Sequence, residues 1–124
     1  MSPRVLLVDD EPLVVRNVKA FLEDEGMEVD GVGSAEEALA RVREGAAYDV
    51  CIMDLRLPGM DGSLAVYALR RLQPALRFII HTGSTAYAVP DELRALGIGE
   101  LQLLRKPLAD MELLADAVRT VTRR

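Results

Sequence analysis

Short apolar runs alternate along the chain with longer segments in which apolar residues recur every three or four positions. Runs typical of buried β-strands occur at residues 5–8, 50–53 and 78–80, with weaker ones at residues 27–32 and 101–104. The segments between them have the spacing of amphipathic helices. The pattern therefore predicts five strands that alternate with helices.

The first two helices have clear start and stop signals. One is expected to begin at Pro12, where a missing N–H breaks no helical hydrogen bond, and to end at Gly26. The next follows Ser34, whose spacing from Glu37 forms a capping box, and should end at Gly45. These signals indicate that each helix occupies the whole interval between two strands.

The later helices carry weaker signals. Asp61 is expected to cap a helix that stops before Pro74, and two more helices are expected near residues 90–96 and 110–120. Strands that alternate with helices form a parallel sheet covered on both faces, and right-handed crossovers leave few topologies. We therefore expect one α/β domain over residues 1–124, a flavodoxin-like (βα)5 doubly wound sheet with strand order 2-1-3-4-5.

Composition narrows the class of protein. The chain has 124 residues, of which 50% are hydrophobic, and this is enough to build a core without disulfides or metals. Its net charge of −5 without a basic cluster argues against nucleic-acid binding. The single cysteine, Cys51, lies in an apolar run, and no apolar stretch approaches the ~20 residues of a membrane span. We expect a soluble, cytoplasmic domain with no contact to a membrane.

Acidic residues follow two of the predicted strands. Asp9 and Asp10 come after the first strand, and Asp54 comes after the third. The expected strand order places these two strand ends side by side, where open α/β sheets bind ligands. Crowded carboxylates repel unless a cation neutralises them, and Mg²⁺ prefers such oxygen ligands. The alternative is that Asp9 or Asp10 caps the helix at Pro12 while Asp54 starts a turn.

Two other predicted strands end in groups that suit an anion. Thr82 places a hydroxyl after the fourth strand, and Lys106 places an ammonium after the fifth. The chain has only one other lysine, Lys19, against many arginines. A lysine at this position therefore favours a role for a compact point charge. Carboxylates, a cation, a hydroxyl and an ammonium around one crevice would bind a phosphoryl group.

With these residues in place, the whole chain resembles the receiver domains of two-component response regulators. The resemblance rests on Asp9-Asp10, on Asp54 within IMDLRLPGMDG, on Thr82 and on Lys106-Pro107. It implies that Asp54 accepts a phosphoryl group from a phosphohistidine, with a histidine kinase or histidine phosphotransfer protein as partner and an output domain or partner protein downstream. It also implies a domain that catalyses only its own phosphorylation and dephosphorylation.

The resemblance assigns further roles. It implies that Asp10, Asp54 and the backbone carbonyl of Arg56 hold Mg²⁺, with Asp9 beside the ion or bound through water. Lys106 would bridge Asp54 and a phosphoryl oxygen, and Thr82 would bind another oxygen and pull its loop inward. A carboxylate can form an aspartyl-phosphate, and transfer depends mainly on alignment and charge stabilisation.

The sequence departs from the family at one position. A Tyr or Phe usually lies three residues before the lysine, but here the residue is Leu103, so the usual aromatic switch cannot operate. Tyr87 is a possible substitute and also a candidate packing residue. His81 is expected to be a packed strand-end residue rather than a phosphocarrier. The arginines at 43, 70–71 and 123–124 are expected on solvated faces.

Two rival functions remain at this point. A haloacid-dehalogenase-like phosphatase also uses an aspartyl-phosphate, but it needs a second aspartate where this chain has Arg56. A degenerate receiver that binds protein partners without phosphorylation gains some weight from Leu103. The acidic set and Lys106 favour the phosphoacceptor.

Overall fold

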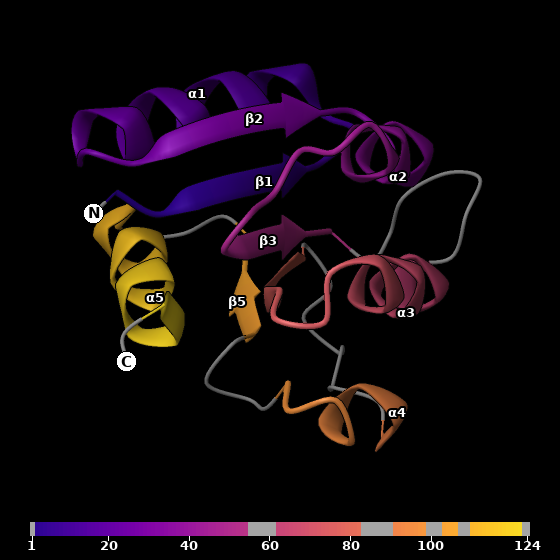
Figure 1. Ribbon diagram of the computed structural model, residues 1–124. Coiled ribbons are helices and arrows are strands. Elements are labelled where there is room, and N and C mark those ends of the chain that lie inside the picture. Colours follow the sequence, from indigo (N-terminus) through magenta and orange to yellow (C-terminus); the bar gives the residue numbers. More distant parts are fainter. Residues whose placement is uncertain (1, 55–61, 83–90, 99–102, 107–109, 123–124) are drawn as a thin grey trace.

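The computed structural model describes residues 2–54, 62–82, 91–98, 103–106 and 110–122. Strands and helices alternate along the chain (Figure 1). The strands are β1 (Arg4–Val8), β2 (Glu28–Val32), β3 (Val50–Met53), β4 (Arg77–Thr82) and β5 (Leu103–Arg105). The helices are α1 (Pro12–Asp24), α2 (Ala35–Arg43), α3 (Gly62–Leu72), α4 (Asp91–Arg94) and α5 (Glu112–Thr122).

The five strands form one parallel sheet in the order β2-β1-β3-β4-β5, which confirms the predicted α/β topology. In Figure 1 the helices divide between the two faces, with α1 and α5 on one and α2 and α3 on the other. Because β1 and β3 are parallel neighbours, their carboxyl ends lie side by side, and the chain leaves both strands at this edge of the sheet. That edge is where the candidate site lies.

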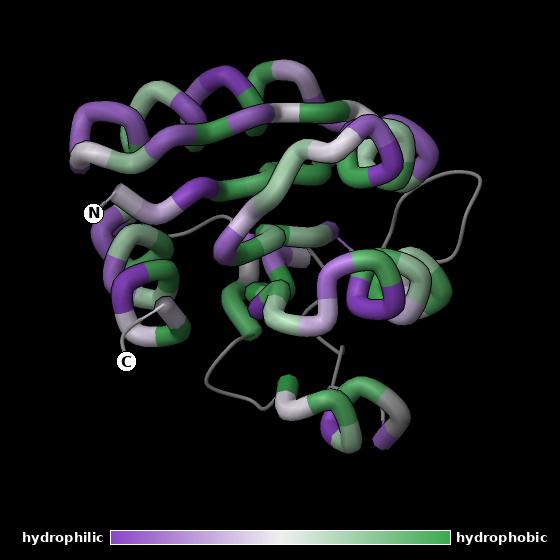
Figure 2. Tube along the Cα trace, in the orientation of Figure 1, coloured by the Kyte–Doolittle hydropathy of each residue, from purple (hydrophilic) through white to green (hydrophobic). Residues whose placement is uncertain are grey.

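Side chains that alternate along each strand build two separate cores. Leu6 and Val8 of β1 pack with α2 and α3, whereas Val5 and Leu7 of the same strand pack with α1 and α5. The central strand β3 is buried at every position, which explains its uninterrupted apolar sequence. In Figure 2, β1 and β3 are mostly green, whereas β2 and the helices mix green and purple.

The predicted signals at the ends of α1 and α2 are confirmed. Pro12 lies in the first turn of α1, and Gly26 and Gly45, with φ of +90° and +103°, follow α1 and α2. Ser34 Oγ accepts from the Glu37 N–H at 3.1 Å. The Glu37 carboxylate in turn accepts from the N–H of Gly33, one residue before the cap, at 3.2 Å. The capping box therefore satisfies two N–H groups, those of Gly33 and Glu37.

The later elements differ from expectation in length. The predicted helix at residues 90–96 is described as a single turn, Asp91–Arg94, which Gly97 terminates with φ of +92°. The last helix lies two residues later than predicted, and Asp61, the expected cap of α3, lies outside the described residues. Within the described ranges, no helix has the length and apolar character that crossing a membrane requires.

Helix α1 approaches β2 closely through a glycine. A Cβ added at Gly31 would lie 2.5 Å from Val15 Cγ1, well inside ordinary contact distance. Further along α1, Lys19 Nζ donates to the backbone carbonyl of Val29 at 3.2 Å and forms an ion pair with Glu23. The absence of a side chain at Gly31 therefore sets how near the helix can lie to the sheet.

Candidate functional site

The candidate site is built on residues that extend the strand ladders by one step. In each case a backbone N–H just beyond a strand donates to a carbonyl of the neighbouring strand. The backbone of these site residues is therefore fixed by the sheet rather than belonging to a free loop. The bonds run from Asp9 N to Val32 O (3.2 Å), from Asp54 N to Val8 O (3.1 Å) and from Lys106 N to Thr82 O (2.8 Å).

Four carboxylates meet at this edge of the sheet. Asp9, Asp10, Glu11 and Asp54 each offer an oxygen, and these oxygens all lie within 4.8 Å of one another. Asp9 and Asp54 are buried, whereas Asp10 and Glu11 are exposed, so the group is open to solvent on one side. Hard oxygen ligands with room for water suit Mg²⁺. The predicted gathering of Asp9, Asp10 and Asp54 is thus observed, and the donor set fits the ion.

Lys106 partly neutralises this group. Its Nζ lies 2.5 Å from Asp9 Oδ2, 3.0 Å from Asp54 Oδ2 and 3.2 Å from Glu11 Oε1. Burial alone would lower the pKa of the Lys106 ammonium, but the hydrogen bonds to Asp9 and Asp54 outweigh it and raise that pKa above its ordinary range. Lys106 is therefore a permanent cation in the centre of the site.

Glu11 is a member of the site that the sequence did not reveal. It is the N-cap residue of α1, and its carboxylate makes no capping bond and contacts Lys106, 95 residues away. The helix entry is held instead by Asp9, whose Oδ1 accepts from the Glu11 N–H at 3.0 Å. Asp9 is therefore not the cap of α1: one of its oxygens accepts from the N–H of the N-cap residue, and the other pairs with Lys106.

Thr82 and Leu103 lie on the last two strands, β4 and β5. Thr82 ends β4 and is fully buried, and its backbone carbonyl bonds Lys106. Leu103 is also buried, and it packs in the core shared with α2 and α3. The side chain that replaces the usual aromatic residue is therefore a core residue here. Arg56 and Tyr87 lie outside the described residues.

His81 is a packed strand-end residue, as predicted. It is 4% exposed, and neither ring nitrogen has a hydrogen-bond partner in the part of the chain that the structure describes. Burial, and then the charge of Lys106, lower the pKa of His81, against the opposing pull of Asp9, Asp54 and Glu11. Burial therefore disfavours the protonated form of this imidazole.

Comparison with known proteins supports the resemblance to receiver domains that the sequence indicated. The family model described as the response regulator receiver domain matches residues 5–119. The chain is 37% identical to the alginate biosynthesis transcriptional regulatory protein AlgB of Pseudomonas aeruginosa, over 94% of this chain and 29% of that protein. It is 34% identical to the transcriptional regulatory protein AruR of the same species, over 99% of this chain and 51% of that protein. The chain thus spans about half or less of these relatives.

Solved structures show the same likeness. The response regulator protein TrrA of Thermotoga maritima, crystallised in complex with Mg²⁺-BeF, is 28% identical with a TM-score of 0.80, and the match covers 98% of this chain and 99% of that chain. A response regulator receiver domain protein from Clostridium thermocellum is 28% identical with a TM-score of 0.82, over 98% of this chain and 95% of that chain.

Proposed function

Because the chain belongs to the response regulator receiver family, we propose that Asp54 accepts a phosphoryl group from the phosphohistidine of a histidine kinase or histidine phosphotransfer protein. Domains of this family are typically signalling modules rather than enzymes, and this chain would turn over only its own phosphoryl group. The observation that carries the proposal is the Lys106 ammonium, joined to Asp54 and Asp9 beside the carboxylate group.

The step is a displacement at phosphorus. A carboxylate oxygen of Asp54 forms the new O–P bond while the P–N bond to the donor imidazole breaks, and that electron pair returns to the ring nitrogen. Bound Mg²⁺ would neutralise charge on the carboxylates and on the transferred oxygens. Asp9, Asp10 and Asp54, with the carbonyl of Arg56, are the proposed ligands. Glu11 lies close enough to join them.

Lys106 must exchange a partner during this step. An ammonium has three N–H donors, and Lys106 already contacts three carboxylates. A phosphoryl oxygen would therefore replace one of them. Glu11 is the most exposed of the three and lies farthest from Nζ, so it is the partner we expect to leave. The Thr82 hydroxyl would bind another phosphoryl oxygen. Movement of Thr82 and Lys106 would then transmit the conformational change to the surface that contacts the output domain or partner protein.

The comparisons support the wider setting of the proposal. AlgB and AruR are named as transcriptional regulatory proteins, and the sensor protein GacS of Pseudomonas syringae is 37% identical over 90% of this chain and 13% of that protein. We propose that residues 1–124 form a receiver domain that signals to an output domain or a partner protein. A receiver that binds partners without phosphorylation remains the second candidate, because Leu103 replaces the usual aromatic residue.

Intact mass measurement tests the proposal. The wild-type protein, incubated with Mg²⁺ and a small phosphodonor such as acetyl phosphate, should gain one phosphoryl group, and a chelator should abolish the gain. Asp54→Asn should gain none, because the amide lacks the charged nucleophilic oxygen. Asp49→Asn is a matched control, since Asp49 is exposed just before β3 begins and should label like the wild type. Equal labelling of Asp54→Asn and wild type would refute the assignment, and no labelling of the wild type would favour the second candidate.

A further inference from the structure

Arg70, in the last turn of α3, does not lie on a solvated face as its sequence position suggests. Its side chain is half-buried, and the guanidinium carbon lies 5.5 Å from the centroid of the Phe78 ring. Nη1 donates to the carbonyl of Leu96 at 3.1 Å, and Nε is buried and finds no acceptor among the described residues. The neighbouring Arg71 is exposed, in agreement with the prediction. Arg70 is therefore held in place between α3, β4 and the end of α4.

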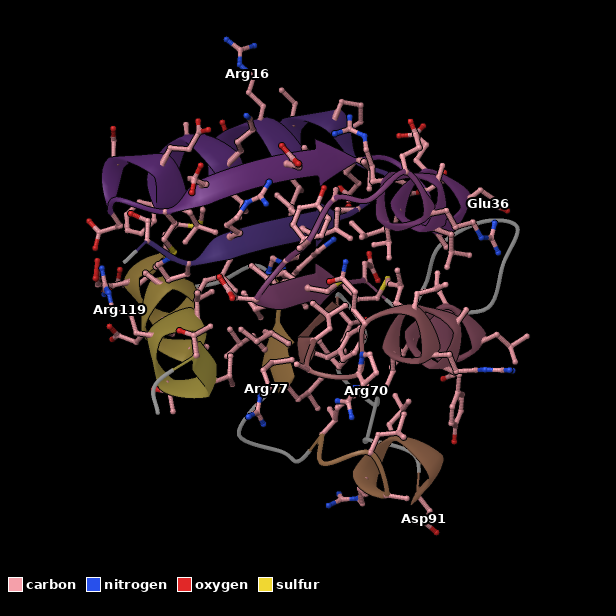
Figure 3. All side chains as sticks on the ribbon, in the orientation of Figure 1. Arg16, Glu36, Arg70, Arg77, Asp91 and Arg119 are labelled. Carbon is pink, nitrogen blue, oxygen red and sulfur yellow. The ribbon has the colours of Figure 1, made fainter. Side chains whose placement is uncertain are left out.

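A second arginine lies beside this one. Arg77 opens β4 and is exposed, and Figure 3 shows Arg70 and Arg77 extending toward the same side of the molecule. Both line a surface hollow of about 210 Å³. The other described residues that line it are Pro74, Ala75, Leu76, Phe78, Leu96 and Gly97. Among the described residues, the lining thus contains two guanidinium groups and no carboxylate.

The described residues leave the two charges uncompensated. Burial, and then the charge of Arg77, lower the pKa of Arg70, and no acidic group in the described ranges acts in the opposite direction. The chain has a net charge of −5, and Lys106, which is also half-buried, contacts three carboxylates. Within the described part of the chain, neither arginine forms an ion pair. An anion placed in the hollow would relieve the repulsion.

We propose that this hollow binds a small organic oxyanion, a phosphate or a carboxylate, between Arg70 and Arg77. Guanidinium groups match both oxyanions, because their N–H donors form a planar fork. Pro74, Ala75 and Leu96 offer apolar contact to a short carbon skeleton. The hollow, about 210 Å³, offers space for one such group and a few carbons.

The site is separate from the phosphoacceptor. Arg77 is at the start of β4, whereas Thr82 is at its end, so the two sites lie at opposite ends of one strand. Ligand binding in the hollow therefore requires neither Mg²⁺ nor Asp54. A bound ligand would instead contact the end of α3, the start of β4 and the turn at Gly97. This turn precedes the last two elements of the chain, β5 and α5.

Titration of the isotope-labelled protein tests the proposal. Inorganic phosphate is added in one series and succinate in another, without Mg²⁺ and with the ionic strength held constant by sodium chloride. We expect saturable NMR shifts of the Gly97 amide and the Arg70 Nε–H with at least one of the two probes, and the tighter probe identifies the class of ligand. In Arg77→Gln, binding should weaken by about tenfold or more, because a charge-assisted hydrogen bond is lost.

Arg71→Gln is the matched control, because it removes the same charge from an exposed neighbour and should bind like the wild type. Arg70→Gln is less informative, since Arg70 also satisfies the carbonyl of Leu96 near the end of α4. Absence of saturable shifts with both probes would overturn the proposal. So would equal binding by Arg77→Gln and wild type, or the same shifts when sodium chloride alone is raised.

Discussion

The close approach of α1 to β2 makes Gly31→Ala a demanding test of the packing. The new Cβ would lie 2.5 Å from Val15 Cγ1, whereas ordinary van der Waals contacts begin at 3.4 Å. The two groups must therefore separate by nearly 1 Å. Val15 is β-branched and has one strongly preferred rotamer in a helix, so it cannot simply rotate away. We expect the helix itself to shift.

The size of the effect follows from two opposing terms. Overpacking of this kind costs about 1–3 kcal/mol, and replacing glycine restricts the unfolded chain, which returns about 0.4–1 kcal/mol. The free energy of unfolding should therefore fall by about 1–2 kcal/mol, which corresponds to a fall in Tm of roughly 3–10 °C for a chain of this size.

Urea and thermal unfolding, followed by circular dichroism, provide the measurement. Gly33→Ala is the control, because a Cβ there meets nothing within 4 Å. Val15→Ala removes the obstructing methyl group, so the double variant should recover about 1 kcal/mol relative to the sum of the single changes. If Gly31→Ala is as stable as the wild type, or if Val15→Ala gives no rescue, then the glycine does not set the helix position.

Two further predictions concern charges in and below the candidate site. Lys106→Met should lower the free energy of unfolding by about 3 kcal/mol without Mg²⁺, because it leaves the buried carboxylates of Asp9 and Asp54 unpaired, and Mg²⁺ should restore part of the loss. Urea unfolding with and without the ion measures this, and a variant as stable as the wild type in the absence of Mg²⁺ would contradict it. The wild type should also lose stability as the pH falls below 6.5, the ordinary pKa of His81, because the unfolded chain takes up a proton that the buried imidazole resists. The slope that His81 adds to the free energy of unfolding against pH should reach at most about 1.4 kcal/mol per pH unit. This added slope should be absent in His81→Leu, so parallel pH curves for the two proteins would refute the assignment.

Local signals in the sequence were sufficient to predict most of the fold. Pro12, Ser34 and Gly45 act on the backbone within a few residues of themselves, so their effects could be deduced without knowledge of the rest of the chain. The alternation of elements and the handedness of crossovers left few topologies, and the common one, with strand order 2-1-3-4-5, placed Asp54 beside Asp9. The main part of the site was therefore predictable from strand-end positions.

Contacts between distant segments were not predictable in this way. Glu11 looks like an ordinary acid at a helix start, and only the packing of β5 beside β4 brings Lys106 to it. Arg70 has the sequence context of an exposed helical arginine. Its burial depends on Phe78 and on the end of α4, neither of which is adjacent to it in the sequence. Both cases require side-chain positions that no local pattern contains.

The contact between Lys19 and Val29 also has a consequence for association between molecules. β2 forms one border of the sheet, and its register with β1 leaves the backbone groups of Val29 pointing outward. Such a border can template the addition of a strand from another chain, which is a common route to aggregation. The Lys19 ammonium covers the Val29 carbonyl at this border, and Glu28 on the same strand adds a charge that an incoming strand would have to desolvate. Lys19 therefore occupies an acceptor that an incoming strand would need, and pairing with β2 at this position would first have to displace it.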